Sequence, residues 1–225
     1  MGIQRDGGDQ IAVACFGDGA TSEGDVSEAM VFAASFAAPV VFVCSNNHWA
    51  ISEPVTLQTR GSIAARAAGF GLESVCVDGN DALACLAAMR WARERARAGA
   101  PAFIEAVTYR MGPHTTSDDP TRYRDAAEVE SWRARDPLAR LETRLRRIGA
   151  WDDAYAGEVA RAGDALAAAM RDAATTAAAR PALAVLDHVY AEPHAGIRRQ
   201  RERFAAYLES IGDESGESDF EGGAR

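Results

Sequence analysis

The sequence contains no lysine: all 24 of its basic residues are arginine, set against 33 acidic residues. The resulting net charge of −9 gives the chain as a whole no basic footprint for nucleic acid. Apolar runs of transmembrane length are missing, and residues 1–6 lack the hydrophobic core of a signal peptide. We therefore expect a cytoplasmic protein that binds neither nucleic acid nor a membrane.

Cysteine is scarce, with four residues and no CxxC or His-linked metal pattern. Cys15, Cys44 and Cys76 fall within expected buried strands, and Cys85 falls on an expected helix. In a chain without a secretory signal, such residues are typical of reduced core cysteines. We therefore expect none of them to take part in chemistry.

The most informative segment present is Gly17-Asp18-Gly19, which follows a short apolar run at residues 11–16. A run of this kind is typical of a buried parallel strand. Glycines at the end of a strand let the backbone turn tightly and bring N–H groups close to an anion. Asp18 adds a carboxylate oxygen, the ligand type that Mg²⁺ prefers.

A paired amide follows the second apolar run of the chain. Residues 40–44 form that run, and Asn46 and Asn47 come directly after it. Because parallel strands end at the same edge of a sheet, we expect this pair to lie near Asp18. Carboxylate, amide and main-chain oxygens could together hold Mg²⁺ and a diphosphate. The spacing therefore predicts a metal–diphosphate clamp.

The order of elements around these motifs indicates an α/β fold, a parallel sheet flanked by helices on both sides. The expected elements are a strand at 11–16, a helix at 24–37, a strand at 40–45, a loop at 46–59, a helix at 62–68, a strand at 73–77, a helix from Asn80 or Asp81 to 98, and a strand at 101–109. Thr21 or Ser22 is the expected N-cap of the first helix. In the third, the mix of apolar and charged residues indicates one buried face and one solvated, Arg-rich face; the residues are Leu83, Leu86, Ala87, Met89 and Arg90.

Beyond residue 110 the pattern changes from alternating elements to helices. Residues 111–125 show no periodicity, and the later segments at 126–148, 153–179, 183–190 and 197–208 look helical. The end, 209–225, carries six acids and one arginine and is typical of a disordered tail. We expect three parts: an α/β core at 1–125, a helical region at 126–208 and an acidic tail at 209–225.

Three separated blocks, at residues 16–25, 46–52 and 109–119, resemble the alpha subunit of the thiamine-diphosphate-dependent 2-oxo acid dehydrogenases. The first two together resemble the GDG…NN thiamine-diphosphate motif. Ala50-Ile51-Ser52 is more similar to the branched-chain (2-oxoisovalerate) type than to the pyruvate type. The resemblance runs from about Asp9 to Tyr190, and the third block argues against a transketolase-like enzyme.

The resemblance implies thiamine diphosphate and Mg²⁺ as cofactors. It implies Asp18, Asn47 and the main-chain carbonyl of Trp49 as metal ligands. The implied cofactor-binding residues are Gly17, Asp18, Gly19, Ala20, Asn47, Trp49, Ala50, Ile51 and His114. Within this set the backbone N–H groups of Gly19 and Ala20 would face a phosphate. For Trp49 and Ile51, simple core packing is an alternative.

His114 is the candidate catalytic residue, because the resemblance places its loop beside the cofactor channel. There it would contact the cofactor phosphate or assist acyl transfer to a lipoyl group, general acid–base work to which an imidazole is suited. Neighbouring hydroxyls are phosphorylated in some relatives, which makes Thr115 a candidate as well. Arg110 and Arg124 could pair with phosphate or with the acidic residues of the loop.

The implied function is decarboxylation of a branched-chain 2-oxo acid and transfer of the acyl group to a lipoyl domain. Pyruvate dehydrogenase and a non-catalytic assembly piece are the alternatives. The implied partners are a beta subunit, in a heterotetramer, and a lipoyl acyltransferase core. The family's N-terminal part, before the GDG strand, is not in this sequence. We expect either one half of a split subunit or a truncated fragment with an unpaired sheet edge.

Overall fold

The computed structural model describes residues 1–212 and leaves residues 213–225 outside the described part. Its centre is a parallel sheet in the order β1-β2-β6-β5. The strands are β1 (Ala12–Gly17), β2 (Val40–Asn46), β5 (Glu73–Asp78) and β6 (Ala102–Val107). The predicted α/β fold with a parallel sheet is therefore confirmed.

The strand register places the predicted motifs at one edge of the sheet. Gly17 at the end of β1 pairs with Ser45 of β2, one residue before Asn46. Ser45 in turn pairs with Ala106 of β6. Since all four strands are parallel, the residues that follow β1 and β2 leave the sheet side by side at their carboxyl ends.

One face of the sheet is covered by α2 (Gly24–Ser35) and α4 (Ile63–Gly69). Phe42 and Phe103 point into this layer, and Phe16 packs edge-on against both rings. The buried thiol of Cys44 lies in the same cluster. Burial, with the nearby charges of Glu105 and Asp18, raises its pKa to about 12 and keeps it a neutral thiol.

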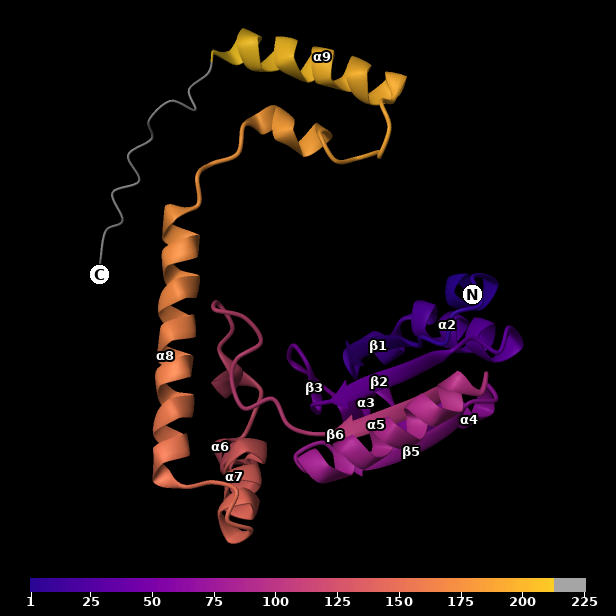
Figure 1. The fold of residues 1–225 in the computed structure, drawn as a ribbon, viewed down its shortest axis with the longest axis vertical. Helices are drawn as coiled ribbons and strands as arrows, with labels where there is room; N and C mark the ends of the chain where they lie inside the picture. The colour runs from indigo at the N-terminus through magenta and orange to yellow at the C-terminus, as the bar shows by residue number, and fades with distance from the viewer. Residues whose placement is uncertain (213–225) are drawn as a thin grey trace. The chain divides into compact units, whose positions relative to one another are not determined.

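The opposite face is covered by α5 (Ala82–Arg97), which Figure 1 shows lying along the sheet. Its buried stripe consists of Ala88, Ala92 and Ala96, whereas Leu83 and Leu86 are about half exposed. The predicted amphipathic helix with one buried face is therefore confirmed, and alanines form that face. Small side chains at positions four apart let the helix lie close to the strands, and the leucines fall on another face.

The expected burial of Cys15 and of Cys76 is wrong. Cys15 and Cys76 are exposed, while all four cysteines are free thiols as predicted. The cause for Cys15 lies in the layer above it, because α5 contacts β2, β5 and β6 but leaves β1 uncovered in the part of the chain that is described. Val13, on the same face of β1, is 48% exposed for the same reason.

The turns at the carboxyl edge hold more structure than the sequence indicated. A short 3₁₀ helix, η1 (Gly19–Ser22), follows Asp18. The expected loop at 46–59 contains a hairpin of β3 (Trp49–Ala50) and β4 (Glu53–Pro54), then α3 (Val55–Gln58). The N-cap of α2 is Glu23, not Thr21 or Ser22. The Thr21 hydroxyl instead donates to the main-chain carbonyl of Asp18, at 2.7 Å.

Helices dominate the remainder, as predicted. They are η2 (Pro120–Arg122), α6 (Ala126–Arg133), α7 (Pro137–Arg147), α8 (Asp153–Thr176), η3 (Ala182–Leu186) and α9 (Ala195–Ile211), with the four-residue α1 (Gly2–Arg5) at the start of the chain. Pro137 splits the helix expected at 126–148, since proline fits the first turn of a helix but not its interior. Because α9 runs to Ile211, residues 209–211 are helical rather than part of the predicted tail, whose other residues from 213 on lie outside the described part.

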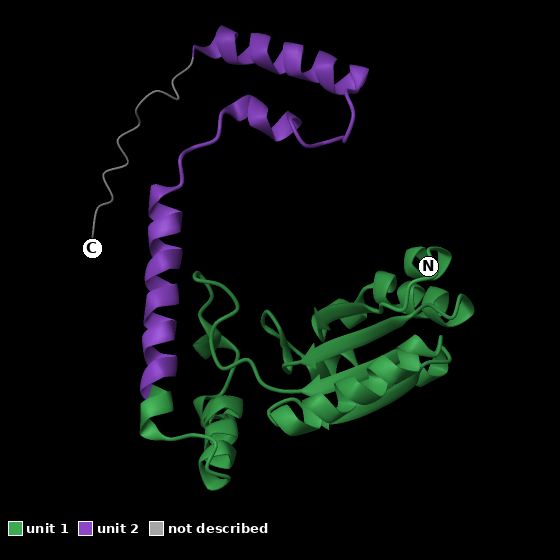
Figure 2. Ribbon diagram, in the orientation of Figure 1, with its two compact units in different colours: residues 1–156 green, residues 157–225 purple. Residues whose placement is uncertain are grey.

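The chain divides into two compact units, residues 1–156 and 157–225, with the division inside α8 (Figure 2). The first unit contains the sheet, the hairpin and α6–α7. The boundaries at 125/126 and 208/209 stay predictions about independently folding parts. None of the helices in residues 1–212 is both long enough and apolar enough to span a membrane.

Candidate functional site

Asp18 is a buried carboxylate that faces only neutral donors. Its side chain is 1% exposed. One oxygen accepts the main-chain N–H of Asn47 at 3.2 Å, and the other accepts the amide of Gln58 at 3.3 Å. No basic side chain in residues 1–212 lies within ion-pair distance of it. Buried carboxylates normally pair with a cation, so this one is suited to receive a metal ion.

The two asparagines have different roles. The main-chain N–H of Asn47 donates to Asp18, and the Asn47 side-chain oxygen accepts the N–H of Trp49 at 3.1 Å. Asn46 turns the other way and donates to the Glu105 carboxylate at 2.8 Å. Between them and the hairpin, His48 adopts a left-handed backbone, φ 69°. Asp18, Asn47 and Trp49, the three predicted metal ligands, are thus joined by two direct hydrogen bonds.

Gly19 lies against the hairpin. A β-carbon placed on it would lie 2.7 Å from the β-carbon of Ala50, which no pair of real side chains tolerates. Gly17 has no atom within 4 Å of the corresponding position, so its side of the turn is open. The predicted residues Gly19 and Ala50 therefore meet, while Gly17 borders free space at the strand end.

The hairpin residues Trp49 and Ile51 are held by one arginine. Arg110 donates to the carbonyls of Trp49, at 3.3 Å, and Ile51, at 2.7 Å. Ile51 is 56% exposed, so core packing does not explain it. Trp49 packs against the ring of Tyr123, 5.4 Å between centroids. The carbonyl proposed as the third metal ligand already faces a guanidinium, and Arg110 would have to shift for a metal to use it.

The loop that carries His114 is joined to the hairpin by a chain of hydrogen bonds. Arg110 donates to the Tyr123 hydroxyl at 2.7 Å, and that hydroxyl donates to Asp118 at 2.6 Å. The same carboxylate oxygen accepts the main-chain N–H of His114 at 2.8 Å. The side chain of His114 is exposed. The structure therefore links His114 to the Trp49 hairpin without placing its imidazole against Asp18.

A cavity of about 440 Å³ lies between the hairpin and this loop. Its walls are Ile51, Ser52, Ser117, Asp118, Asp119, Arg122 and Tyr123. Arg110 and Arg124 do not pair with the acids of the loop, as one alternative supposed. Arg124 instead donates to the carbonyls of Arg110 and Met111 and so fixes the backbone where the His114 loop begins.

Polar atoms without partners gather beneath the hairpin. The Nδ1 of His48, the indole N–H of Trp49, the hydroxyl of Tyr109 and the Nε of Arg110 are all buried without a hydrogen bond. The rings of His48 and Tyr109 pack together and against Trp132 of α6. Burial is the main cause that raises the pKa of Tyr109. The hairpin is therefore held mostly by ring packing and by Arg110.

Sequence reasoning missed Glu105 and Gln58. Glu105 is 3% exposed, and its second oxygen accepts the hydroxyl of Ser62 at 2.6 Å and the N–H of Ala64 at 2.8 Å. A lone acid inside the apolar strand at 102–107 is a signal that could have revealed it. Gln58 offered no such signal, because its approach to Asp18 depends on the unpredicted α3.

The donor set fits a hard cation only in part. Within residues 1–212 no cluster of three His, Cys, Asp or Glu side chains is arranged around a metal position. The set that is present consists of the Asp18 carboxylate, the Asn47 amide oxygen and a main-chain carbonyl. These are the oxygen donors that suit Mg²⁺, which usually keeps waters and phosphate oxygens in its remaining positions. Asp18 and Asn47 thus fit such a group, and Trp49 fits it less well.

Comparison with known proteins agrees with the fold and the motif. A family model described as "Dehydrogenase E1 component" matches residues 1–185. The chain is 49% identical over 210 residues to a 3-methyl-2-oxobutanoate dehydrogenase subunit alpha of Mycobacterium tuberculosis, covering 92% of this chain and 57% of that protein. It is 40% identical over 214 residues to the mitochondrial 2-oxoisovalerate dehydrogenase subunit alpha of Mus musculus, covering 93% and 48%.

A pyruvate dehydrogenase E1 component subunit alpha of Acholeplasma laidlawii is also similar, 39% identical over 209 residues, covering 90% of this chain and 60% of that protein. The chain thus spans about half the length of the curated relatives that it matches. The parallel sheet, the motif at its carboxyl edge and the family match over most of the sequence lead to one conclusion: the chain belongs to the dehydrogenase E1 component family.

Proposed function

We propose that this chain is the cofactor-holding portion of the alpha subunit of a 2-oxo acid dehydrogenase. The observation that carries the proposal is Asp18, a fully buried carboxylate with neutral donors only, bonded to Asn47 at the open carboxyl edge of the sheet. A buried carboxylate without a cation is costly, and a bound Mg²⁺ with a diphosphate would balance its charge.

Each residue of the site has a role that follows from its position. Asp18 and the amide oxygen of Asn47 would hold Mg²⁺, with the Trp49 carbonyl as a third ligand once Arg110 moves off it. Gly17 borders open space that a diphosphate could occupy, and Gly19 and Ala20 would present backbone N–H groups to it. Ala50 and Ile51 would lie beside the aminopyrimidine ring. Bound thiamine diphosphate would supply the carbanion chemistry that decarboxylates a 2-oxo acid.

His114 is proposed to bind the cofactor phosphate or to move a proton during acyl transfer. Its exposed imidazole stands on a loop that Asp118 and Tyr123 fasten to the hairpin, so the loop needs no further ordering to border the cavity. Thr115, beside it, is a candidate for phosphorylation on the same loop.

A branched-chain 2-oxo acid is the proposed substrate, because two of the similar proteins are named for 3-methyl-2-oxobutanoate and 2-oxoisovalerate. Pyruvate is the second candidate, since a pyruvate dehydrogenase alpha subunit is also similar. The proposed partners are a beta subunit in a heterotetramer, which would supply the glutamate that activates the aminopyrimidine, and a lipoyl acyltransferase core. The proposed compartment is the cytoplasm.

Replacing Asp18 tests the clamp. In the assembly with its beta subunit, Asp18→Ala should weaken Mg²⁺-dependent binding of thiamine diphosphate by about 100-fold, since a buried charged ligand is lost. Calorimetric titration measures the affinity. The exposed Asp164 on α8 is the matched control, and Asp164→Ala should leave binding unchanged. Unchanged affinity in Asp18→Ala would refute the clamp, and absence of heat with the parent assembly would favour a non-catalytic assembly piece.

Replacing His114 separates cofactor binding from later steps. If the imidazole moves a proton during acyl transfer, His114→Asn in the same assembly should lower kcat by about 100-fold while the thiamine diphosphate affinity stays within about twofold. If it binds the phosphate instead, the affinity should fall with kcat. An unaltered kcat and affinity would remove His114 from the site. Steady-state rates with 2-oxoisovalerate and with pyruvate, on the parent assembly, would decide the substrate.

A further inference from the structure

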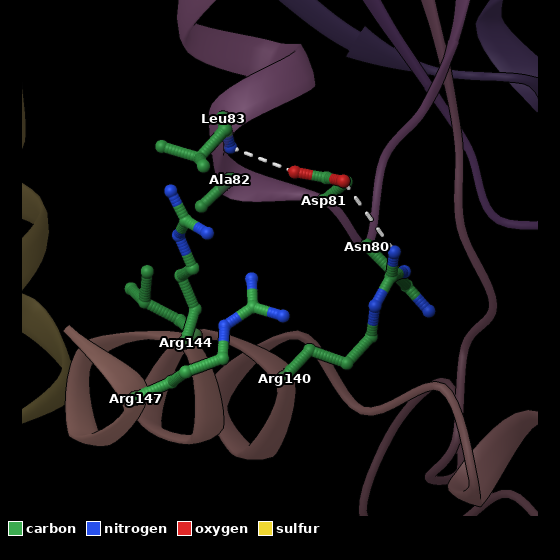
Figure 3. A pocket seen from close by; sticks show the side chains of 8 residues that line it. Asn80, Asp81, Ala82, Leu83, Arg140, Arg144 and Arg147 are labelled. Atoms are coloured by element: carbon green, nitrogen blue, oxygen red, sulfur yellow. Dashed lines mark hydrogen bonds and ion pairs between the residues drawn. The ribbon is translucent and has the colours of Figure 1, made fainter.

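A second cavity, of about 350 Å³, opens between the start of α5 and one face of α7. Figure 3 shows the side chains of Arg144 and Arg147 extending from α7 toward Ala82 and Leu83 of α5, and that of Arg140 toward Asn80 and Asp81. The cavity lies past the end of β5, two strands away from β2, and shares no lining residue with the site around Asp18.

The charges that line this cavity do not balance. Arg140 is ion-paired with Asp78 at 2.8 Å and with Asp81 at 3.5 Å. Arg144 and Arg147 have no carboxylate within ion-pair distance among residues 1–212. Two guanidinium charges are therefore unpaired at one concave position of a chain whose net charge is −9. Such a position attracts anions.

The direction of the arginines follows from how α7 is anchored. Asp136 caps its first turn, and the ion pairs of Arg140 turn one face of the helix toward α5. Residues four and seven positions after Arg140 share that face, so Arg144 and Arg147 point into the crevice. Leu138, on another face, is left 76% exposed. The side chains of Arg144 and Arg147 thus lie between α5 and α7.

Two of the N–H groups at the start of α5 are not free to bind a ligand in this cavity. The N–H groups of Leu83 and Ala84, at the start of α5, already donate to Asp81 at 2.9 and 3.1 Å. The available donors are guanidinium forks, whose planar geometry matches phosphate oxygens in pairs. The cavity volume lies in the range of small-molecule sites and is larger than a single halide ion or water molecule requires.

We propose that this cavity is a binding site for a small anion with more than one phosphate group. Arg144 and Arg147 grip the phosphates, and Arg140, fixed by its two carboxylates, forms the rigid wall. The proposal does not depend on the function proposed above, because it uses none of the residues around Asp18.

The test uses inorganic pyrophosphate, titrated calorimetrically into the full chain at near-physiological salt with a chelator to remove divalent cations. The expected result is saturable binding that weakens by at least about tenfold in Arg144→Gln/Arg147→Gln, since two charge-assisted contacts are lost. The matched control is Arg198→Gln/Arg199→Gln on α9, which removes the same charge from exposed, unpaired arginines and should leave the affinity unchanged. Inorganic phosphate, tested in parallel, should bind more weakly than pyrophosphate.

Three results would overturn the proposal: no binding to the parent chain, binding unchanged in the Arg144/Arg147 variant, or an equal loss in both double variants, which would mean general charge attraction only. If the glutamine variant fails to fold by circular dichroism, Arg144→Lys/Arg147→Lys replaces it. That variant keeps both charges but lacks the bidentate fork, and an affinity equal to that of the parent chain would count against the site.

Discussion

Two buried carboxylates in this protein differ in how their oxygens are used. Glu105 receives three donors, all at 2.8 Å or less: the amide of Asn46, the hydroxyl of Ser62 and the N–H of Ala64. Asp18 receives two donors at 3.2 and 3.3 Å. A carboxylate with short bonds to several donors is a structural link, whereas one with long bonds has capacity left for a ligand. Glu105 therefore positions Asn46 and the start of α4.

Removing the Glu105 side chain should destabilise the fold strongly. Glu105→Ala leaves three donors unpaired and a void in the core, and we expect a loss of about 3 kcal/mol in the free energy of unfolding. Glu105→Gln keeps the shape and at most two acceptor contacts, so its loss should be about half as large. Urea unfolding measures both. The exposed Glu209 on α9 is the control, with Glu209→Ala expected to change stability by less than about 0.5 kcal/mol.

Equal losses of stability in Glu105→Ala and Glu105→Gln would contradict this account, because the shape and the acceptor contacts that glutamine keeps would then contribute nothing. A loss below about 1 kcal/mol in Glu105→Ala would contradict it as well.

At the scale of elements, the hairpin β3–β4 determines which residues fit at the glycine turn. It lies so close to Gly19 that any side chain there would collide with Ala50. The hairpin is in turn held by Arg110, which bonds two of its carbonyls and Tyr123. The glycine turn, the hairpin and the His114 loop thus form one connected structure at the carboxyl edge of the sheet.

Gly19→Ala should therefore destabilise the chain by about 1–3 kcal/mol, the usual cost of overpacking a tight contact. Gly17→Ala is the neighbouring control: no atom lies within 4 Å of its added β-carbon, and its effect on stability should be within about 0.5 kcal/mol or slightly favourable. Both are measured by urea unfolding without cofactor. Equal effects of the two substitutions would show that the hairpin does not lie against Gly19 in solution.

At the scale of the first compact unit, an ion pair links the end of the sheet to the helices that follow it. Asp78, at the end of β5, accepts from Arg140 of α7 and from the N–H of Asn80. Burial acts to raise the pKa of Asp78, but the bonds from Arg140 and Asn80 and the charges of Arg140 and Arg135 together hold it below its ordinary value of 3.8. The pair is solvent-exposed on both sides, so its contribution is small.

The pH dependence of this link has a definite sign. A carboxyl group whose pKa is depressed on folding stabilises the fold above its unfolded pKa and loses that contribution as pH falls through the folded pKa. Asp78→Asn should therefore lower the Tm slightly at pH near neutrality, and the difference from the parent chain should begin to shrink near the ordinary pKa of 3.8 and vanish only below the lower folded pKa. Thermal unfolding followed by circular dichroism across this range measures it. A difference that grows on acidification would contradict the assignment.

The sequence by itself determined the alternation of strands and helices, because strand and helix periods and turn residues act over a few neighbouring positions. It also placed Asp18 and the Asn46-Asn47 pair at strand ends, and the family resemblance that these motifs carry was confirmed. For the same local reason it narrowed the cap of α5 to Asn80 or Asp81, and the structure has Asp81 there.

Only the tertiary structure decided which residues meet. β6 enters the sheet between β2 and β5, which brings Glu105 beside Asn46 over a separation of 59 residues. The position of α5 over three of the four strands buries its alanines and leaves Cys15 open. These outcomes depend on strand order and on distant packing partners, and no local pattern carries that information.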